Sequence, residues 1–416
     1  MEFIRDLTTI CVAGWGKTGI SLTKMLLSLG KKVKVTEIRK KNYFCSQRIK
    51  YFQAKGVSFE FNGHSEEFIK SCDLVILSPG INLSRSKLSD IAIKNHISCI
   101  GELEFAYYFT DAKIIAITGT NGKTTTAHLV YRLLRQKNKN VYLGGNIGRP
   151  FSEFVLDTQK EDIVVLEVSS FQLETIIKFR PYIAVLLNVE VDHIDRHKSF
   201  DNYLKTKLKI FQNQQKFDWA VINKKVNLSD SFLSQINPKV IYFGTELPDE
   251  NLSAAYRIGK IFGITKTDCH LLFSRYQKLP HRQQLIKELN KIKFINDSKA
   301  TNLSSTLFAL KSLKPPIILI AGGQDKDIHY SDLGEYARKI KKINLIGQAA
   351  DKIRNELGDK FKCQKFNSLK EAVLSSYKQA KAFDTILFSP MCSSFDMFSN
   401  YKERGQKFIE IVNNIS

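Results

Sequence analysis

Residues 114–130 read IIAITGTNGKTTTAHLV, and this stretch decides the fold of the central part of the chain. The run Ile114–Ile117 is apolar and mostly β-branched, which predicts a short buried strand. A turn from Gly119 to Gly122 follows, and a helical segment opens at Lys123. A strand, a glycine-rich turn and a helix in this order direct backbone N–H groups toward an anion. The stretch therefore predicts a phosphate-binding loop.

The residues after the turn favour a nucleotide site over a turn that only caps a helix. In the pattern GxxxxGK[ST] the lysine reaches the terminal phosphates and the next hydroxyl binds Mg²⁺. Lys123 and Thr124 would fill these roles, although the first glycine lies closer to the lysine than the pattern requires. The expected ATP-binding residues of the loop are Gly119, Thr120, Asn121, Gly122, Lys123, Thr124 and Thr125.

Composition and charge limit the classes of function. The chain has 416 residues, 43% of them hydrophobic, which predicts two to four globular domains. It has no apolar run long enough for a membrane span, no signal-peptide pattern and no CxxC pair among seven cysteines, so we expect a cytoplasmic protein. The net charge of +22 is spread along the chain, which favours a lysine-rich solvated surface or attraction for an anionic small substrate over nucleic acid. We expect a monomer without nucleic-acid or membrane partners.

The N-terminal region predicts a second nucleotide-binding fold. The stretch Gly14–Gly19 fits GxGxxG between a strand and a helix, and a second strand ends at Glu37 about 20 residues later. Because this motif is weak alone, we infer only an anionic ribose-phosphate ligand, and a turn without a ligand stays an alternative. The expected strands are Thr8–Val12, Lys32–Thr36 and Asp73–Leu77.

Strands and helices alternate to the end of the chain, which predicts three α/β domains at residues 1–101, 102–279 and 280–416. The N-terminal and C-terminal domains would be Rossmann-like, and the central domain would hold a parallel sheet of the P-loop ATPase type. Glu167 and His193 follow strands, so topology places them at the same sheet edge as the phosphate loop. The expected later strands are Asp162–Val168, Tyr182–Val189, Pro316–Ala321, Lys342–Ile346 and Asp384–Ser389.

This edge suggests ATP with Mg²⁺, but it leaves the phosphate acceptor open. Glu167 would supply an oxygen ligand, and its alternatives are a helix cap or a buried ion pair. His193 would complete a metal shell, and its alternative is a hydrogen-bonded loop histidine. If the acceptor were water the protein would be an ATPase, and if it were a hydroxyl, a kinase. If it were a carboxylate, an acyl phosphate would form that an amine could attack.

The whole chain resembles the Mur ligases, and several motifs resemble their D-glutamate-adding members in particular. The matching motifs are TGTNGKT (118–124), GGNIG (144–148), EVSSFQLE (167–174), NVEVDHIDR (188–196), LPHR (279–282), NDSKATN (296–302) and SPMCSSFDMF (389–398). The resemblance implies a UDP-sugar domain, a central ATPase domain and a C-terminal amino-acid domain. It implies that D-glutamate is added to UDP-N-acetylmuramoyl-L-alanine through an acyl phosphate, in cytoplasmic peptidoglycan precursor synthesis.

Two alternatives remain beside this reaction. One is another amide ligase of the superfamily, such as the L-alanine-adding Mur ligase or a folylpolyglutamate synthetase, which SSFQLE and SKATN argue against. The other is a degenerate nucleotide-binding protein, suggested by the short segment before Asn251. The presence of Lys123, Glu167 and His193 argues against such decay.

The resemblance also implies roles for individual residues. Lys207 would be carbamylated and hold metal, with Lys205 a competing candidate, and the metal set would be Thr124, Glu167, His193 and Lys207. Lys123, Glu167, His193 and Lys207 would be catalytic. Further nucleotide contacts would be Asn251, Arg282, Asp297 and Lys299. The UDP-sugar would contact Thr18, Glu37, Arg39, Ser78, Gly80, Asn146 and Ser169, and D-glutamate would contact Thr301, Lys326, Ser394, Phe395 and Tyr401. Trp15 and Lys17, bulky for their loop, are expected to alter the uracil pocket.

Overall fold

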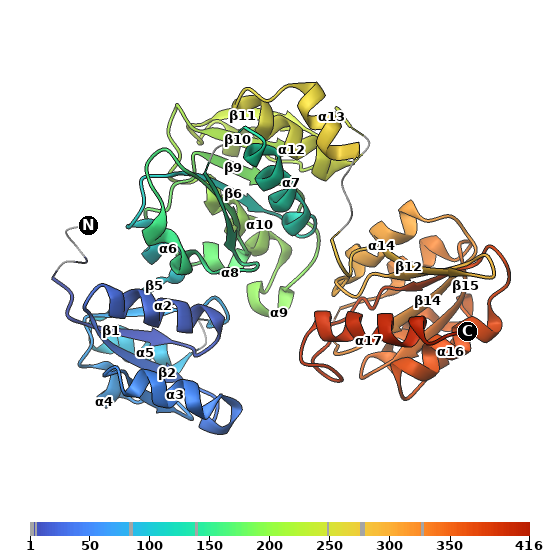
Figure 1. Cartoon of the computed structure of the whole chain (residues 1–416), viewed down its shortest axis with the longest axis horizontal. Helices are drawn as coiled ribbons and strands as arrows, with labels where there is room; N and C mark the ends of the chain where they lie inside the picture. The colour runs from blue at the N-terminus through green and yellow to red at the C-terminus, as the bar shows by residue number, and fades with distance from the viewer. Residues whose placement is uncertain are drawn as a thin grey trace. The chain divides into compact units, whose positions relative to one another are not determined.

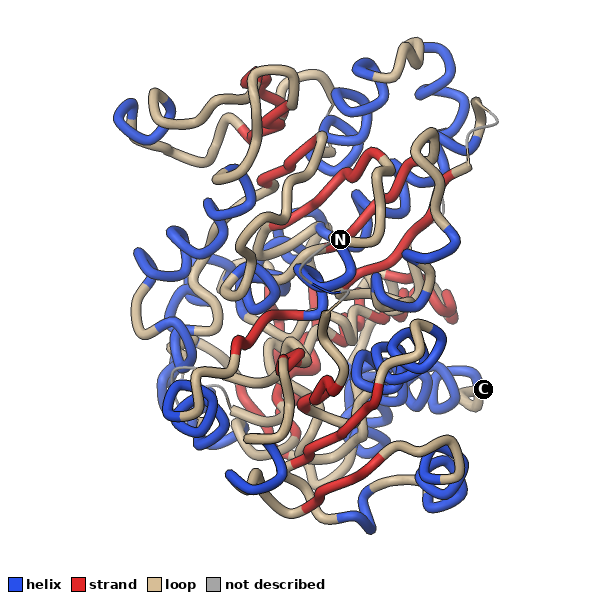
Figure 2. The backbone as a smooth tube through the Cα atoms, turned by 90° about the vertical axis from the view of Figure 1, so that its left-hand side faces the viewer, coloured by secondary structure: helices blue, strands red, loops and turns tan. Residues whose placement is uncertain are grey.

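The computed structural model describes residues 4, 6–82, 86–137, 140–247, 249–274, 279–325 and 328–416. In this part of the chain, three sheets of five, six and six strands are flanked by helices, which confirms the predicted three-domain α/β architecture (Figure 1). The chain divides into two compact units. The first comprises Met1–Val189 and Ser199–Arg275, and the second comprises Glu190–Lys198 and Tyr276–Ser416. Figure 2 traces the alternation of strand and helix along the backbone.

The first sheet is parallel throughout, with the order β3-β2-β1-β4-β5. Its strands are β1 (Thr9–Ala13), β2 (Lys32–Glu37), β3 (Ser58–Phe61), β4 (Leu74–Leu77) and β5 (Ser98–Gly101). Its helices are α2 (Lys17–Ser28), α3 (Ser46–Gln53), α4 (Glu66–Ile69), α5 (Lys87–Lys94) and α6 (Glu102–Tyr107). The side chains of β1 alternate between two apolar clusters, since Ile10 and Val12 pack with α2 and Cys11 packs with α5. The three predicted strands of this region are confirmed.

The second sheet is also parallel, with the order β11-β10-β9-β6-β8-β7. Its strands are β6 (Lys113–Thr118), β7 (Val141–Gly145), β8 (Ile163–Glu167), β9 (Ile183–Leu186), β10 (Trp219–Asn223) and β11 (Lys239–Phe243). Its helices are α7 (Lys123–Arg135), α8 (Ser170–Leu173), α10 (Phe200–Leu208), α11 (Asp230–Leu233), α12 (Glu250–Ile261) and α13 (Lys266–Ser274). Helix α12 packs on α7 (Figure 1). In this contact Gly259 lies against Leu133. The buried strand β6 is central, as its apolar sequence predicts.

The third sheet belongs to the second unit and has the order β12-β13-β17-β14-β15-β16. Its strands are β12 (Gln284–Leu289), β13 (Ile292–Asn296), β14 (Ile317–Gly322), β15 (Ile340–Ile346), β16 (Cys363–Lys365) and β17 (Thr385–Phe388). The helices of this unit are α9 (Ile194–His197), α14 (Leu303–Ser312), α15 (Ala350–Leu357), α16 (Leu369–Gln379) and α17 (Tyr401–Asn413). Residue Leu387 of β17 faces the cluster that contains α14 and α15, whereas Ile386 and Phe388 face α16 and α17.

One feature of the third sheet differs from the predicted alternation of strand and helix. Strand β12 pairs antiparallel with β13, so the C-terminal domain begins with a hairpin. The remaining pairs are parallel, which places the loops after β13, β14, β15 and β17 at one edge. Among the described residues, no helix has the length and apolar character required to cross a membrane.

Candidate active site

The loop between β6 and α7 requires its glycines. Gly119 and Gly122 have φ values of 155° and 82°, which non-glycine residues rarely adopt. A Cβ at Gly119 would lie 2.9 Å from the Cβ of Leu187, and one at Gly122 would lie 2.2 Å from Asn251 Oδ1. Gly122 is also the N-cap of the 13-residue helix α7. The loop therefore brings backbone N–H groups and the helix N-terminus close together, as an anion site requires.

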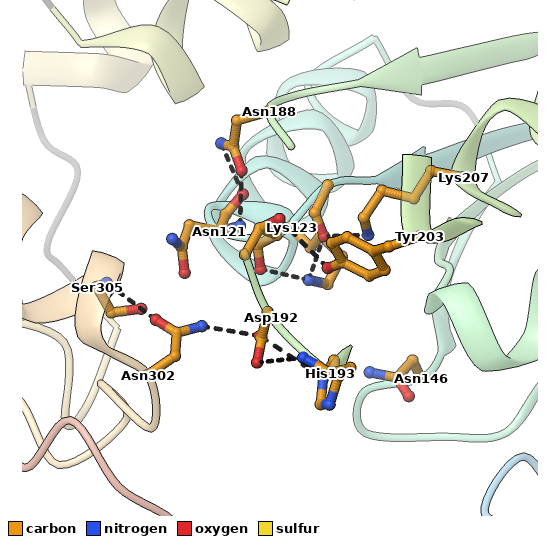
Figure 3. Close-up of polar contacts among 12 residues, drawn as sticks. Asn121, Lys123, Asn146, Asn188, Asp192, His193, Tyr203, Lys207, Asn302 and Ser305 are labelled. Atoms are coloured by element: carbon orange, nitrogen blue, oxygen red, sulfur yellow. Dashed lines mark hydrogen bonds and ion pairs between the residues drawn. The ribbon is translucent and has the colours of Figure 1, made fainter. Parts of the chain in front are cut away.

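An asparagine that we did not predict as a site residue holds this loop in shape. Asn188, two residues after β9, accepts a hydrogen bond from the Asn121 amide at 2.8 Å through its side-chain oxygen (Figure 3). Its side-chain nitrogen donates to the Asn121 carbonyl at 3.2 Å, and its own carbonyl accepts from the Thr120 amide at 3.0 Å. The loop is thus fixed before any ligand binds, which lowers the entropic cost of binding.

Two lysine ammonium groups donate hydrogen bonds to the same backbone oxygen. Lys123 Nζ donates to Gly119 O at 2.6 Å, and Lys207 Nζ donates to that same atom at 2.9 Å (Figure 3). Lys207 on α10 is 1% exposed and lies 4.4 Å from the ring centre of Tyr203, whereas Lys205 is exposed. Two like charges so close together are unfavourable unless an anion neutralises them or one loses its charge. This arrangement favours Lys207 over Lys205 as a site residue.

Thr124 and Glu167 place two oxygen atoms that could ligate a metal beside the loop. Thr124 Oγ1 donates to Glu167 Oε2 at 2.7 Å, and Asn146 Nδ2 donates to Glu167 Oε1 at 2.8 Å. Glu167 is 3% exposed and ends β8, next to β6 in the sheet. A hydroxyl and a carboxylate are ligands that Mg²⁺ prefers, and Mg²⁺ usually takes its remaining ligands from water and phosphate. The donor set thus fits Mg²⁺, although the described residues contain no cluster of three His, Cys, Asp or Glu side chains.

His193 belongs to the second unit, where hydrogen bonds among Asp192, Asn302 and its own backbone fix the segment that carries it. Its φ of 54° is left-handed, and its amide donates to Asp192 Oδ1 at 3.0 Å. Asn302, another residue that we did not predict, donates to Asp192 Oδ2 at 2.9 Å and accepts from the Ser305 amide at 2.9 Å (Figure 3). Asn302 therefore connects the start of α14 to the segment that carries His193. A shared sheet edge for His193 and the phosphate loop stays a prediction.

The expected UDP-sugar residues of the N-terminal domain lie around the ends of β1, β2 and β4. The buried Glu37 carboxylate accepts from the Trp15 amide at 2.8 Å and from Arg39 Nε at 3.0 Å, so it connects the first glycine loop to Arg39. Ser78 Oγ donates to Gly14 O at 3.4 Å. The expectation for Trp15 is wrong: its side chain is 2% exposed and packs edge-on against Phe52 and Phe59 in the core. The other expected residues are Thr18, in the first turn of α2, and Gly80, after β4.

Glu37 makes the stability of this domain depend on pH. Burial raises the pKa of Glu37, but hydrogen bonds from Arg39 and Trp15 outweigh burial and hold it below the ordinary value of a glutamate. The carboxylate therefore stabilises the fold above its unfolded pKa and loses this effect as the pH falls through the folded pKa. We expect Glu37→Gln to lower the melting temperature at pH 7 by roughly a few degrees, and to lose less stability than the wild type as the pH falls through the lowered pKa of Glu37. Parallel acid profiles of the two proteins, measured by circular dichroism, would contradict this.

Two further residues of the first unit have local structural roles. Ser169 is the N-cap of α8 and forms a capping box with Gln172, in which each side chain bonds the backbone of the other. Asn251 Oδ1 accepts from Thr126 Oγ1 at 3.1 Å, so it joins α12 to α7 directly behind the phosphate loop. Both residues lie beside the site, and their contacts with ligands stay predictions.

The second unit brings together most of the expected C-terminal residues. Asp297 accepts hydrogen bonds from the Gln283 amide at 3.1 Å and from Ser389 Oγ at 2.8 Å. Lys299 Nζ lies 4.5 Å from the ring centre of Tyr401. The other expected residues are Arg282 before β12, Thr301 after β13, buried Ser394 after β17, and Phe395, which is 69% exposed. Lys326 lies outside the described residues.

Comparisons with known proteins agree over the whole chain. Residues 8–101 match the Mur ligase MurD-like N-terminal domain, 117–277 the Mur ligase middle domain and 281–392 the Mur ligase glutamate ligase domain. The chain is 35% identical over 446 residues to the UDP-N-acetylmuramoylalanine--D-glutamate ligase of Thermoanaerobacter sp. (strain X514), covering 97% of each chain. It is 36% identical over 441 residues to the ligase of that name from Caldanaerobacter subterraneus subsp. tengcongensis, again covering 97% of each. The MurF ligase of Thermotoga maritima, solved in complex with ADP, shares the fold with a TM-score of 0.59 at 16% identity, over 98% of this chain and 95% of that one.

Proposed function

The chain belongs to the Mur ligase family, and from this premise we propose that it joins D-glutamate to UDP-N-acetylmuramoyl-L-alanine in peptidoglycan precursor synthesis. The observation that carries this proposal is the match to relatives of that name over nearly their full length and over all three domains. It agrees with the predictions from SSFQLE and SKATN, and it disfavours the L-alanine-adding and folylpolyglutamate alternatives. We further propose that the enzyme works as a monomer in the cytoplasm.

The reaction proceeds in two steps that share one intermediate. An oxygen of the substrate's L-alanyl carboxylate attacks the γ-phosphorus of ATP, and the bond to the bridging oxygen breaks to release ADP. The amine nitrogen of D-glutamate then attacks the carbonyl carbon of this acyl phosphate. Inorganic phosphate leaves with the electron pair of the C–O bond, and the nitrogen loses a proton. The products are the amide, ADP and phosphate.

The phosphate loop supplies positioning and charge for the first step. The N–H groups of the loop hold the phosphates, and Lys123 leaves Gly119 O to neutralise the charge that develops on the transferred group. Thr124, Glu167, His193 and a carbamylated Lys207 would hold Mg²⁺, which supplies charge neutralisation at the phosphates when bound. Asn251, Arg282, Asp297 and Lys299 would contact the nucleotide.

The other two ligands would occupy the first and third sheets. Arg39 and the helix N-terminus of α2 would meet the negative charge of the UDP group, with Glu37 fixing both through its hydrogen bonds. Thr301, Lys326, Ser394, Phe395 and Tyr401 would surround D-glutamate. Asn146 and Ser169 would lie near the sugar-borne carboxylate.

The test of this function is the identity of the product. The enzyme is incubated with ATP, Mg²⁺ and UDP-N-acetylmuramoyl-L-alanine, together with D-glutamate, L-glutamate or L-alanine in separate reactions, and the products are analysed by mass spectrometry. We expect an amide product with D-glutamate and none with the others. A product with another amino acid would move the enzyme to a different ligase, and no product with any would support the degenerate alternative.

Lys207 offers a test of the metal site with a matched control. A charged amine at Lys207 would repel Mg²⁺, whereas a carbamate would attract it, because carbamylation replaces a cation with an anion. We expect Lys207→Ala to lower kcat by roughly a hundredfold or more, and the exposed Lys205→Ala to change it by less than about twofold. The measurement is steady-state phosphate release at saturating substrates. Equal losses in the two variants would contradict the assignment of Lys207.

A further inference from the structure

Helix α17 carries a buried arginine that the proposed chemistry has not used. Arg404 is 1% exposed, and its five N–H donors make five hydrogen bonds. Nε and Nη2 bond Oγ and O of Ser298 at 3.1 and 2.9 Å. Both Nη atoms bond Cys392 O at 3.1 Å, and Nη1 also bonds Ser393 O at 3.0 Å. Each nitrogen of the guanidinium is therefore hydrogen-bonded.

The charge of this guanidinium is not balanced by its partners. The five bonds go to four acceptor atoms, all of them neutral carbonyl or hydroxyl oxygens, and no carboxylate of the described residues accepts a hydrogen bond from it. Burial lowers the pKa of Arg404 to about 10, although Cys392 and the Asp396 carboxylate act in the opposite direction, and the group stays protonated at neutral pH. Asp396 acts on this charge from a distance, but no carboxylate is hydrogen-bonded to the guanidinium, and a buried cation without a directly paired anion is costly, so its surroundings favour an anion.

The two loops that Arg404 joins carry the expected amino-acid residues. Ser298 lies in the loop after β13, which continues to Thr301, and its Oγ donates to Tyr401 O at 2.8 Å. Ser393 lies in the loop after β17 and directly precedes Ser394 and Phe395. These loops are adjacent because β13 and β17 pair in parallel. The guanidinium thus joins the loop after β13 to the loop after β17 and fixes the distance between them.

A second contact fixes the same loop from the neighbouring strand. The Gln324 amide donates to Ser393 O at 3.0 Å, so this carbonyl accepts two hydrogen bonds, one of them from Arg404. Gly323, with φ of 140°, leaves no room for a side chain, since a Cβ would lie 2.3 Å from Ser393 O and 3.1 Å from Arg404 Nη1. The position of the Ser393 carbonyl is therefore determined on two sides.

We propose that Arg404 is a positioning residue for the amino-acid site, where it holds the loops after β13 and β17 in register and favours a dicarboxylate ligand through its buried charge. The inference rests on the proposed function, because it takes D-glutamate as the ligand. Arginine suits this role and lysine does not, since a planar group with five donors can bridge both loops whereas an ammonium offers three donors from one point.

The test separates binding of the amino acid from binding of ATP. In Arg404→Lys, which keeps the charge but loses the bridge and at least two of the five hydrogen bonds, we expect KM for D-glutamate to rise roughly tenfold. In Arg404→Gln, which loses both, the rise is roughly a hundredfold. KM for ATP stays within about twofold in both. Inhibition by glutarate, a dicarboxylate without the amine, weakens more in Arg404→Gln than in Arg404→Lys.

Two further variants keep the inference falsifiable. Lys407→Gln removes an exposed charge from the same helix and is expected to leave every KM unchanged. If the Arg404 variants do not fold, Ser298→Ala removes one acceptor and keeps the charge, and a smaller rise in KM for D-glutamate is expected. Unchanged KM for D-glutamate, or equal rises in KM for D-glutamate and ATP, would overturn the inference. A wild-type enzyme that makes no product with D-glutamate would instead overturn the proposed function.

Discussion

Replacement of Lys123 by alanine is expected to lower kcat by about three orders of magnitude or more. Phosphoryl transfer depends on charge neutralisation and alignment of the phosphates, and the protein contributes few covalent steps of its own. In the structure the Lys123 ammonium donates hydrogen bonds to Gly119 O at 2.6 Å and Thr120 O at 2.7 Å, inside the loop that would surround the phosphates. Its removal leaves the developing charge without its nearest fixed cation from the loop.

The measurement for Lys123 is single-turnover phosphate release with ATP and both other substrates. Lys178→Ala, which removes an exposed lysine of the same unit, serves as the control and is expected to behave as the wild type. The loop should keep its shape in Lys123→Ala, because Asn188 holds it independently through Asn121 and Thr120. Turnover within tenfold of the wild type would show that the phosphate loop is wrongly assigned.

The second large effect is expected from Glu167→Gln, which should lower kcat by roughly a hundredfold to a thousandfold. The substitution keeps the shape of the side chain but removes the negative charge that would hold Mg²⁺. Thr124 now donates to Oε2, and its hydroxyl can turn to accept from an amide instead, so the fold should tolerate the change. Asn146 can still donate to the remaining oxygen.

A metal role for Glu167 predicts more than lost activity. The concentration of Mg²⁺ that gives half-maximal turnover should rise in Glu167→Gln, because one anionic ligand is missing. The control is Glu153→Gln, which removes a partly exposed carboxylate of the same unit that pairs with Arg149. A loss of turnover without any change in Mg²⁺ dependence would assign Glu167 a structural role, as a partner of Thr124 and Asn146 only.

The phosphate loop and the parallel strands could be predicted because their signals are local. Strand β6 is a continuous apolar run, and glycine, lysine and threonine follow it in a fixed order. The hairpin of β12 and β13 carries no such signal. Its turn places Asn290 and Lys291 at φ values of 50° and 63°, where a hairpin usually has Asn-Gly. Because lysine replaces the usual glycine, the sequence does not indicate a hairpin at this point.

The residues that support the site could not be predicted in the same way. Asn188 and Asn121 are 67 positions apart, and Asn302 and Asp192 are 110 apart, so each pair depends on the tertiary fold. Arg404 resembles any other charged residue of an amphipathic helix until its burial is known. Trp15 follows a glycine in a loop, and only the packing of Phe52 and Phe59 shows that its ring belongs to the core.

We propose that ATP activates the carboxylate of UDP-N-acetylmuramoyl-L-alanine as an acyl phosphate before D-glutamate attacks. The most direct test uses this substrate with heavy oxygen in its L-alanyl carboxylate, followed by mass spectrometry of the phosphate that is released. We expect one heavy oxygen to pass from the carboxylate to each phosphate formed with the amide product. Amide product accompanied by phosphate that contains no heavy oxygen would contradict it.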